Sequence, residues 1–427
     1  MYARTWGETT CGINGEMIVV EVDVANGKFN FEIVGLADTA VKESRERVRS
    51  AIKNSSCKFP DQHITVNLAP ADLKKDGSGL DLPIAIGILA AQARLELPKD
   101  DAPVFVGELA LDGSLRPVSG ILPMILRARD EGRGSIFIPA GNAEEGELVD
   151  GINVFTAHHL SEIVRHLKGE AALLPLKKCL RFSEEEIPTT VDFSDVQGQV
   201  VAKRALEIAA AGGHNILMVG APGAGKTMLA RRLPTILPPM TEEEALEVTK
   251  IYSIAGLLSH RHGIVMERPF RSPHHTVSNS ALIGGGSIPK PGEVTLSHHG
   301  VLFLDELPEF TRSSLEVLRQ PLEDREVHIS RVNASFVYPS DFVLIAAMNP
   351  CPCGYLGDPD HPCTCSDGEI RSYGRKISGP LLDRIDLHVS VMRPKYSELT
   401  AAIKGESSAR IAERVAAARA MQSERLS

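Results

Sequence analysis

Apolar runs alternate with amphipathic stretches along the first part of the chain. Strand-like runs are MIVVEVDV (17–24), HITVNL (63–68), VFVGEL (104–109) and SIFIP (135–139). Between and after them come three helical patterns, TAVKESRERVRSAIK, LPIAIGILAAQARL and LSEIVRHLKG. Short apolar or alternating runs favour strands, whereas apolar positions that recur every three or four residues favour helices. We therefore predict an α+β domain over residues 1–170.

A polar, acidic segment comes next, SEEEIPTTVDFSD (183–195), which contains proline and no basic residue. This composition is typical of a linker, and we place one at residues 171–195. Beyond it, the apolar strands NILMVG, VLFLDE and FVLIAAMNP alternate with helical stretches. Continuous apolar strands alternating with helices predict an α/β domain with a parallel sheet covered on both faces. This second domain is placed at residues 196–394, and a helical segment is expected over 395–427.

Composition narrows the class of protein. A chain of 427 residues should hold two or three domains, and 43% hydrophobic with 24% charged residues describes a globular protein. The longest apolar run, LPIAIGILAAQA, is about half a membrane span, and the N-terminus has no apolar signal-peptide core. We therefore predict a cytoplasmic protein with no membrane partner. Because the net charge is −9, any nucleic-acid site must be a local patch.

The segment GAPGAGKT (220–227) fits the phosphate-binding pattern G-x-x-x-x-G-K-[ST] and lies between the strand NILMV and the helix TMLARRL. Glycines let backbone N–H groups surround phosphates at a helix N-terminus. In this interpretation Lys226 reaches the β- and γ-phosphates of ATP, and Thr227 holds Mg²⁺. The alternative is a glycine-rich turn that binds nothing. The predicted nucleotide-binding residues are Gly220, Ala221, Pro222, Gly223, Ala224, Gly225, Lys226 and Thr227.

Polar residues at the ends of two later strands complete the predicted catalytic set. Asp305 and Glu306 come after an apolar strand, at the end where open α/β sheets bind ligands. Asp305 suits the Mg²⁺ shell, and Glu306 suits polarising the attacking water. Asn349 ends another strand and is expected to orient that water, or else to cap a turn before Pro350. Arg384 lies between two aspartates, either as a structural ion pair or as a finger acting on a neighbouring subunit's γ-phosphate.

Four cysteines crowd into NPCPCGYLGDPDHPCTC (349–365). Two C-x-C pairs separated by a turning segment suit tetrahedral Zn²⁺, and a metal site is more common than a disulfide in a cytosolic protein. We predict zinc ligation by Cys351, Cys353, Cys363 and Cys365, with His361 as a substitute for one thiolate. The alternative is four free structural thiols.

The segments GAPGAGKT, VLFLDELPEF, AAMNPCPCG and LLDRIDLHV together resemble AAA+ ATPases of the magnesium-chelatase-like branch. RSPHHTVSNSALIGGG and PKPGEVTLSHHGVLFLDE are similar to the ComM/YifB competence family. The resemblance implies a homohexameric, ATP-driven DNA motor that promotes branch migration during recombination in natural transformation. It implies ATP and Mg²⁺ as cofactors, DNA (branched or single-stranded) as partner, and no partner subunit. It also implies that residues 395–427 begin a helical lid that continues in other family members.

Residues 1–170 resemble the proteolytic domain of Lon, with GELALDGSLRPVSGILPMILRARDEG (107–132) matching the segment that carries the catalytic lysine. Leu122 falls at the lysine position and Gly79 at the serine position, with Ser78 one residue early. Because leucine cannot activate a serine, we expect a pseudo-protease domain. An ATP-dependent protease, a protein-remodelling ATPase and a magnesium-chelatase motor subunit stay as alternatives.

Two segments are expected to contact DNA. Residues 260–299 hold six histidines and several basic residues, of which we single out Arg271, His274, His275 and Lys290. EVHISRVNASFVYP (326–339) predicts a β-hairpin with Arg331 near its tip, suited to gripping a phosphate backbone. The alternatives are histidine packing at a subunit interface and an ordinary surface hairpin.

Overall fold

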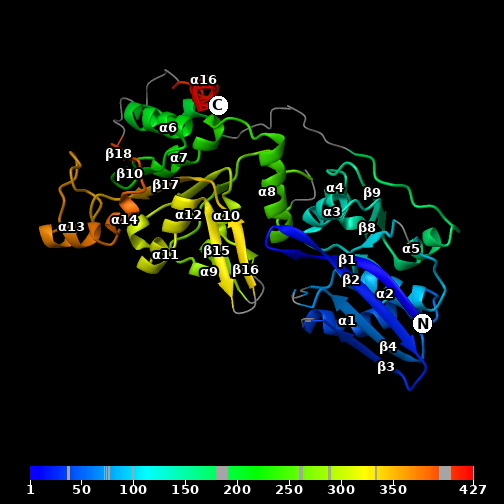
Figure 1. The fold of residues 1–427 in the computed structure, drawn as a ribbon. Coiled ribbons are helices and arrows are strands. Elements are labelled where there is room, and N and C mark those ends of the chain that lie inside the picture. The colour runs from blue at the N-terminus through cyan, green and yellow to red at the C-terminus, as the bar shows by residue number, and fades with distance from the viewer. Residues whose placement is uncertain are drawn as a thin grey trace. The chain divides into compact units, whose positions relative to one another are not determined.

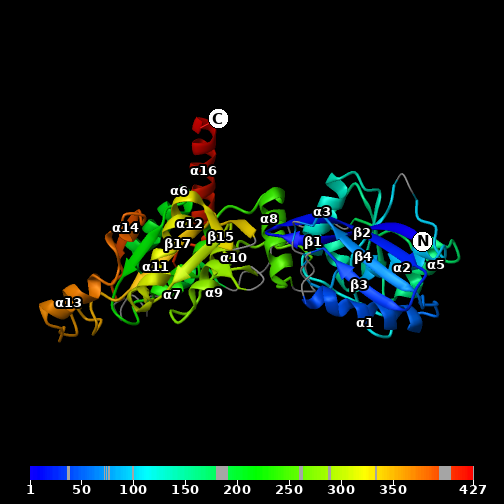
Figure 2. The same ribbon diagram turned by 60° about the horizontal axis from the view of Figure 1, so that its bottom comes forward.

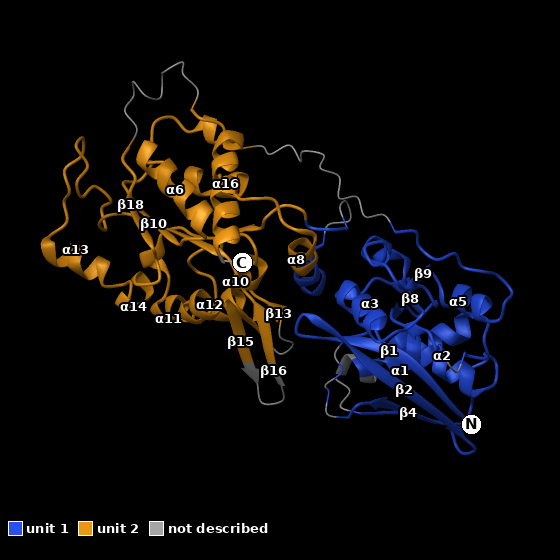
Figure 3. Cartoon of the chain, turned by 45° about the horizontal axis from the view of Figure 1, so that its top comes forward, with its two compact units in different colours: residues 1–182, 249–265, 331–334 blue, residues 183–248, 266–330, 335–427 orange. Residues whose placement is uncertain are grey.

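The structure, a computed structural model, describes residues 1–35, 39–71, 73, 75, 77–98, 101–178, 191–258, 263–286, 290–331, 334–393 and 405–426. The chain divides into two compact units (Figure 3). One comprises residues 1–182, 249–265 and 331–334, and the other residues 183–248, 266–330 and 335–427. We call them the N-terminal unit and the C-terminal unit.

The N-terminal unit is built on a seven-stranded mixed sheet in the order β3-β4-β2-β1-β5-β8-β9. The long antiparallel pair β1 and β2 pairs Tyr2 with Asp23 at one end and Cys11 with Asn14 at the other. The strands are β1 (Tyr2–Cys11), β2 (Asn14–Ala25), β3 (Asn30–Val34), β4 (His63–Ala69), β5 (Val104–Phe105), β8 (Ser135–Pro139) and β9 (Asn153–Ala157). The helices are α1 (Thr39–Asn54), α2 (Asp81–Ala91), α3 (Ile121–Asp130), α4 (Ala143–Gly146) and α5 (Leu160–Leu167).

Helix α2 is the buried centre of this unit. Ten of its eleven residues are buried, in keeping with a sequence that is apolar all round. Its one charged residue, Asp81, accepts two hydrogen bonds from the Arg47 guanidinium of α1, at 2.7 and 3.0 Å. The buried carboxylate is thereby paired, as buried charges need to be.

The C-terminal unit contains a five-stranded, wholly parallel sheet in the order β11-β14-β17-β10-β18. Figure 1 labels β17, β10 and β18 of this sheet. Its strands are β11 (Phe270–Arg271), β14 (Val301–Leu304), β17 (Val343–Met348), β10 (Ile216–Val219) and β18 (Leu387–Ser390). Three of them are almost fully buried, since Val, Ile, Leu and Phe side chains on both faces meet covering elements. The order is typical of AAA+ ATPases, so the predicted parallel α/β fold after an N-terminal mixed domain is confirmed.

Helices and short ribbons surround this sheet. The 19-residue α16 (Ser408–Leu426), the long rod in Figure 2, packs its Ile411 and Val415 into the core beside α6. The other elements are α6 (Val200–Gly212), α7 (Lys226–Ala230), α9 (Asn279–Ile283), α10 (Glu293–Leu296), α11 (Arg312–Glu316), α12 (Arg319–Asp324), α13 (Asp367–Gly374), α14 (Gly379–Leu382) and the ribbons β12 (Gly284–Gly285) with β13 (Lys290–Pro291) and β15 (Glu326–Arg331) with β16 (Ala334–Pro339). Helix α8 (Glu242–Ala255) begins in this unit, and its residues from 249 onward belong to the N-terminal unit.

Most predicted elements are present, and the hairpin predicted at 326–339 is confirmed as β15 and β16. Three local features differ from the prediction. The expected strand VFVGEL instead splits at Gly107 into β5 and β6 (Glu108–Leu109). Val106 still donates to Phe137 of β8, but Gly107 donates to Gly79 and so leaves that ladder. The expected linker ends in an ordered 3-10 turn, Phe193–Asp195, whose Phe193 side chain is fully buried. Residues 405–407 precede α16 without helical structure, and 394–404 lie outside the described residues.

Within the described ranges, no helix combines the length and the apolar character that crossing a membrane needs.

Candidate active site

The phosphate loop joins β10 to α7 at the carboxyl edge of the parallel sheet. Gly223 and Gly225 adopt left-handed backbone conformations, with φ of 76° and 90°, which glycine adopts without steric cost. The Gly220 N–H donates to Met348 O of the neighbouring β17 at 3.2 Å. The loop is therefore fixed between two strands, and its last glycine lies directly before the helix.

Lys226 points back across this loop. Its ammonium donates to Gly220 O at 2.6 Å, to Ala221 O at 3.2 Å and to Asn349 Oδ1 at 3.1 Å. Burial lowers the pKa of Lys226, while the nearby carboxylates of Asp305 and Glu306 oppose that shift. The predicted phosphate-binding lysine and the predicted water-orienting asparagine thus meet in one place.

The two predicted Mg²⁺ ligands are also in contact. Thr227 Oγ1 donates to Asp305 Oδ2 at 2.8 Å. A hydroxyl and a carboxylate oxygen at this separation fit the oxygen-rich, octahedral shell of Mg²⁺. Glu306 comes next in the chain with a left-handed backbone (φ 52°), and its half-exposed side chain points to the same edge of the sheet. Such backbone strain in a non-glycine residue is typical of functional sites.

A cavity of about 420 Å³ lies beside Glu306 and Asn349. Tyr373 and Lys376 of the α13 region form its opposite wall. Burial raises the pKa of Tyr373 to about 12. Lys376 pairs with Glu309 at 3.1 Å. The cavity therefore adjoins both residues assigned to the attacking water.

Arg384 lies elsewhere, on the surface after α14. Its guanidinium pairs with Glu323 of α12 at 2.6 and 2.7 Å, and its side chain is 44% exposed. Among the described residues of one subunit, it forms no hydrogen bond or ion pair with Lys226 or Glu306. This geometry agrees with either of the two interpretations, a surface ion pair or a group that faces a second subunit.

The residues predicted to contact DNA are not equally available. Arg271 forms a bidentate ion pair with Glu293 at 2.6 and 2.8 Å, whereas Lys290 in β13 is exposed. His274 is exposed, and its ring centroid lies 4.0 Å from that of His275, with the planes tilted by 35°. Nδ1 of His275 lies 3.2 Å from Oε2 of Glu306. Arg331 ends β15, but its side chain lies outside the described part of the chain, as do His260, Arg261 and His262.

The four clustered cysteines come together as predicted from their spacing. The Sγ atoms of Cys351, Cys353 and Cys363 lie 3.3 to 3.6 Å apart, and the Cys353 N–H donates to Cys365 Sγ at 3.4 Å. All four sulfurs lie within 4.8 Å of one another. Tetrahedral Zn²⁺ with Zn–S bonds of about 2.3 Å needs sulfurs about 3.8 Å apart, so the donor set fits zinc. His361 is instead stacked on Tyr355 and is not part of this cluster.

The cysteine segment also contacts the phosphate loop. A Cβ at Gly354, whose φ is 86°, would lie 2.7 Å from Cδ of Pro222. Arg393 donates to Pro222 O at 3.0 Å, and Gln199 donates to Ala224 O at 3.0 Å. The segments that contain Gly354, Arg393 and Gln199 therefore all contact the phosphate loop from outside residues 220–227. No local sequence pattern marks them, because each lies far from residues 220–227 in the chain.

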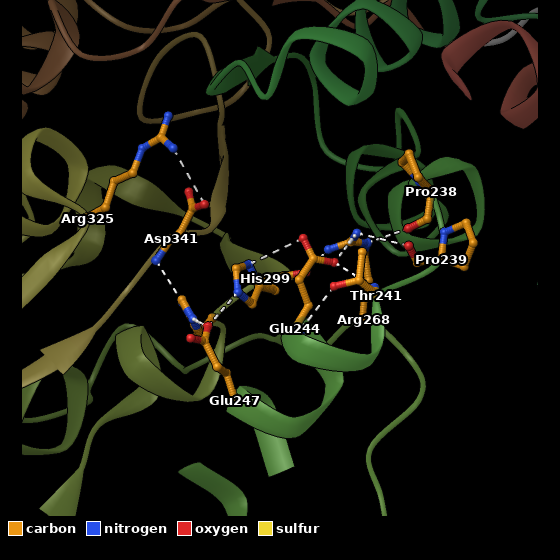
Figure 4. A network of polar contacts seen from close by, with 10 residues as sticks. Pro238, Pro239, Thr241, Glu244, Glu247, Arg268, His299, Arg325 and Asp341 are labelled. Carbon is orange, nitrogen blue, oxygen red and sulfur yellow. Dashed lines mark hydrogen bonds and ion pairs between the residues drawn. The ribbon is translucent and has the colours of Figure 1, made fainter. Parts of the chain in front are cut away.

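A second group with metal-ligating side chains lies at the opposite edge of the sheet. Glu247 of α8 lies 3.2 Å from Nε2 of His298 and 3.1 Å from Nε2 of His299, within the polar network of Figure 4. However, the Asp341 N–H donates to Nδ1 of His298 at 3.0 Å. The neutral ring must then carry its proton on Nε2, which cannot also bind a metal. We interpret this group as a structural hydrogen-bond network.

In the N-terminal unit, the position of a Lon-type catalytic lysine is filled by a core residue. Leu122 is fully buried, and its N–H donates to Glu145 Oε2 at 3.1 Å. Ser78 contacts the Glu108 carboxylate. A serine paired with a carboxylate lacks the lysine that Lon-type chemistry uses.

The sheet order and the meeting of a phosphate loop with two acids and an asparagine define a magnesium-chelatase-like AAA+ ATPase. Family models agree: "Magnesium chelatase, subunit ChlI" matches residues 192–399, and "Subunit ChlI of Mg-chelatase" matches residues 20–142.

More particularly, the chain belongs to the ComM/YifB family. It is 46% identical to Competence protein ComM of Haemophilus influenzae, over 99% of this chain and 83% of that protein. It is 47% identical to the uncharacterized protein YifB of Salmonella typhimurium, over 96% of this chain and 80% of that protein. Lon protease 2 of Bacillus subtilis is 26% identical over 35% of this chain and 30% of that protein. The predicted family and the partial similarity to Lon are confirmed.

Proposed function

We propose that this chain is an ATP-driven motor on DNA, a homohexamer that moves branched or single-stranded DNA during recombination in natural transformation. The observation that carries the proposal is the convergence of Lys226, Thr227, Asp305, Glu306 and Asn349 at one sheet edge. The coupling to DNA is supported by membership of a family in which one relative is named a competence protein.

Each of these residues has a different role in the transfer of the phosphoryl group to water. Mg²⁺ neutralises charge on the phosphate oxygens when bound, and Thr227 and Asp305 would hold it. Lys226 exchanges its carbonyl partners for the β- and γ-phosphates. Glu306 accepts a hydrogen bond from the attacking water and polarises it, and Asn349 orients that water. The protein forms no covalent bond to the substrate in this scheme. The rate enhancement therefore comes mainly from positioning the nucleotide, Mg²⁺ and the attacking water.

We further propose that Cys351, Cys353, Cys363 and Cys365 bind one structural Zn²⁺. A four-thiolate site is a closed, structural type that keeps no open position for a substrate. Its place beside Pro222 supports a role in holding the phosphate loop.

Contact with DNA would be independent of sequence. Lys290, the histidine pair His274 and His275, and the hairpin that carries Arg331 are the proposed contacts, and Arg271 would first have to leave Glu293. Contacts to phosphates release counterions, so binding weakens steeply as the salt concentration rises.

The test is ATP hydrolysis measured alone and with single-stranded, duplex and branched DNA at several salt concentrations. We expect DNA to stimulate turnover, with less stimulation at high salt, and Lys226→Ala to be inactive throughout. Robust hydrolysis that no DNA form changes would contradict the motor function and favour the protein-remodelling alternative.

A further inference from the structure

The sole tryptophan of the chain, Trp6 of β1, lies beside two guanidinium groups. Cζ of Arg4 is 4.4 Å from the centroid of the indole ring, and Cζ of Arg133 is 3.8 Å from it. Arg4 precedes Trp6 by two residues in the same strand, and Arg133 lies just after α3. All three side chains belong to the N-terminal unit, to which the proposed function gives no task.

The contact with the ring orients these two guanidinium groups without using their hydrogen-bond donors. A cation over an aromatic ring is attracted to the ring face, whereas the five N–H bonds of a guanidinium lie in its own plane. In the part of the chain that the structure describes, neither Arg4 nor Arg133 forms a hydrogen bond or an ion pair. By contrast, Arg129 of α3 pairs with Asp130 at 2.8 Å. The donors of the first two arginines are therefore available to a ligand.

The acidic groups near these arginines do not pair with them. Glu8 of β1 is buried, and burial raises the pKa of its carboxyl well above the ordinary range, which favours the neutral form. Glu21 lies opposite Arg4 across the β1–β2 pair. Its carboxylate instead accepts hydrogen bonds from the Tyr2 hydroxyl at 3.0 Å and from the Asn67 amide at 2.9 Å. Two positive charges therefore remain without a carboxylate partner.

An accessible aromatic ring lies on the same face of the strand. Side chains at alternate positions of a strand point to one face of the sheet, so Tyr2, Arg4 and Trp6 share a face of β1. Tyr2 is 63% exposed, which leaves its ring accessible to a planar ligand. Proteins that bind single-stranded nucleic acid combine positive charge for the backbone with aromatic rings on which bases stack. The surface at the start of β1 offers both.

We propose that Arg4, Arg133 and Tyr2 form a binding site for single-stranded DNA on the N-terminal unit. The two guanidinium groups bind backbone phosphates, and the Tyr2 ring stacks on a base. Because these contacts are common to all strands, the site does not distinguish sequences. The proposal rests on the proposed function in taking DNA as the partner, and it adds a contact outside the ATPase sheet.

Trp6 makes this site directly observable, because the chain has no other tryptophan. Titration of the full chain with a short single-stranded oligothymidine should change the fluorescence of Trp6, and the change should saturate together with the anisotropy of a labelled strand. In the double variant Arg4→Ala, Arg133→Ala, the slope of log affinity against log salt concentration should be smaller by about 1.4, because each phosphate contact to a single strand contributes about 0.7. The double variant Arg4→Lys, Arg133→Lys keeps both charges and should keep the slope.

Tyr2 provides a second test that leaves both arginines in place. Tyr2→Ala should weaken binding of single-stranded DNA at least about fivefold, because a base loses its stacking partner. Tyr2→Phe keeps the ring and should bind as the parent does. Arg129→Ala removes an arginine that is already paired and should keep the salt slope of the parent. Basal ATP hydrolysis should be the same in all these variants, since none of them changes the phosphate loop or its neighbours.

The outcomes separate this inference from the proposed function. A salt slope in the double alanine variant equal to that of the parent, or Trp6 fluorescence unchanged at saturating DNA, would overturn the site even if DNA stimulates hydrolysis. A change in Trp6 fluorescence with oligoglutamate or inorganic phosphate, but none with single-stranded DNA, would overturn it as well. The expected change in slope, in a chain whose hydrolysis responds to no form of DNA, would uphold the site and remove the motor function.

Discussion

The rings of His298 and His299 lie at the edge of the sheet opposite the phosphate loop, with centroids 3.8 Å apart and planes tilted by 37°. A backbone N–H fixes the tautomer of His298. Protonation of His298 would direct an N–H at the Asp341 N–H, which repels it. Burial, reinforced by the charge of His299, lowers the pKa of His298 to about 4. Its ordinary value is 6.5, so the ring stays neutral in the folded chain over a pH range in which the unfolded chain is protonated.

This shift predicts a stability that depends on pH. Because the folded pKa is depressed, the contribution is fully present above about pH 6.5 and is lost as pH falls toward 4. Between about pH 7 and about pH 5 the loss is about 2 kcal/mol. Hydrogen exchange of peptides covering 242–248 and 298–304, corrected for intrinsic rates, should show the loss of protection.

His298→Gln should remove most of that pH dependence, whereas His388→Gln, at an exposed histidine of β18, should retain it. Protection that is the same at both pH values in the parent, or an equal decline in His298→Gln, would contradict the tautomer assignment.

Single residues also show how much of the site could be predicted from the sequence. Lys226, Thr227, Asp305, Glu306 and Asn349 were predictable, because each lies in a local pattern of apolar strand plus polar end that forces it to the carboxyl edge of the sheet. The contact of His275 with Glu306 was not predictable. Strand β11 has only two residues, so no periodic pattern fixes the position of the loop that carries His275.

At the scale of elements, the cysteine segment that we propose to bind zinc lies against the phosphate loop. We predict one equivalent of zinc per chain by elemental analysis of protein purified without added metal. Cys351→Ser should lose the zinc and weaken MgATP binding several-fold, because Gly354 would no longer be held against Pro222. Cys57→Ser, at a half-buried cysteine of the N-terminal unit, should change neither. A folded, metal-free parent would end the zinc assignment.

The elements that sequence patterns missed have physical reasons. The first strand, Tyr2–Cys11, carries Arg, Glu and several Thr residues, and it is recognisable as a strand only through its pairing with β2. The helix after the phosphate loop ends at Ala230 rather than extending to Leu233. Arg232 there turns inward, donating to Asp192 O and Asp195, and a 3-10 turn that contains Pro234 begins at Leu233. In both cases, contacts with residues elsewhere in the chain determine the structure. The local sequence therefore does not reveal it.

At the scale of the whole molecule, the role of Arg384 determines whether one subunit is sufficient for ATP hydrolysis. We predict that it acts on a neighbour's γ-phosphate, leaving Glu323 when a second subunit docks. Arg384→Ala and Lys226→Ala should each be inactive alone, and mixing them should restore part of the hydrolysis, since each supplies what the other lacks. Absence of rescue in rings verified to be mixed would assign Arg384 to a structural ion pair within its own subunit.

The central claim is that this chain hydrolyses ATP with Glu306 as the water-polarising group. Its most direct test is Glu306→Gln, measured for MgATP affinity by fluorescent nucleotide and for hydrolysis in a single turnover. We predict an affinity within a few-fold of the parent and a hydrolysis rate lower by roughly 100-fold or more, because only the water-polarising step is removed. A single-turnover rate equal to that of the parent, with binding intact, would contradict the claim.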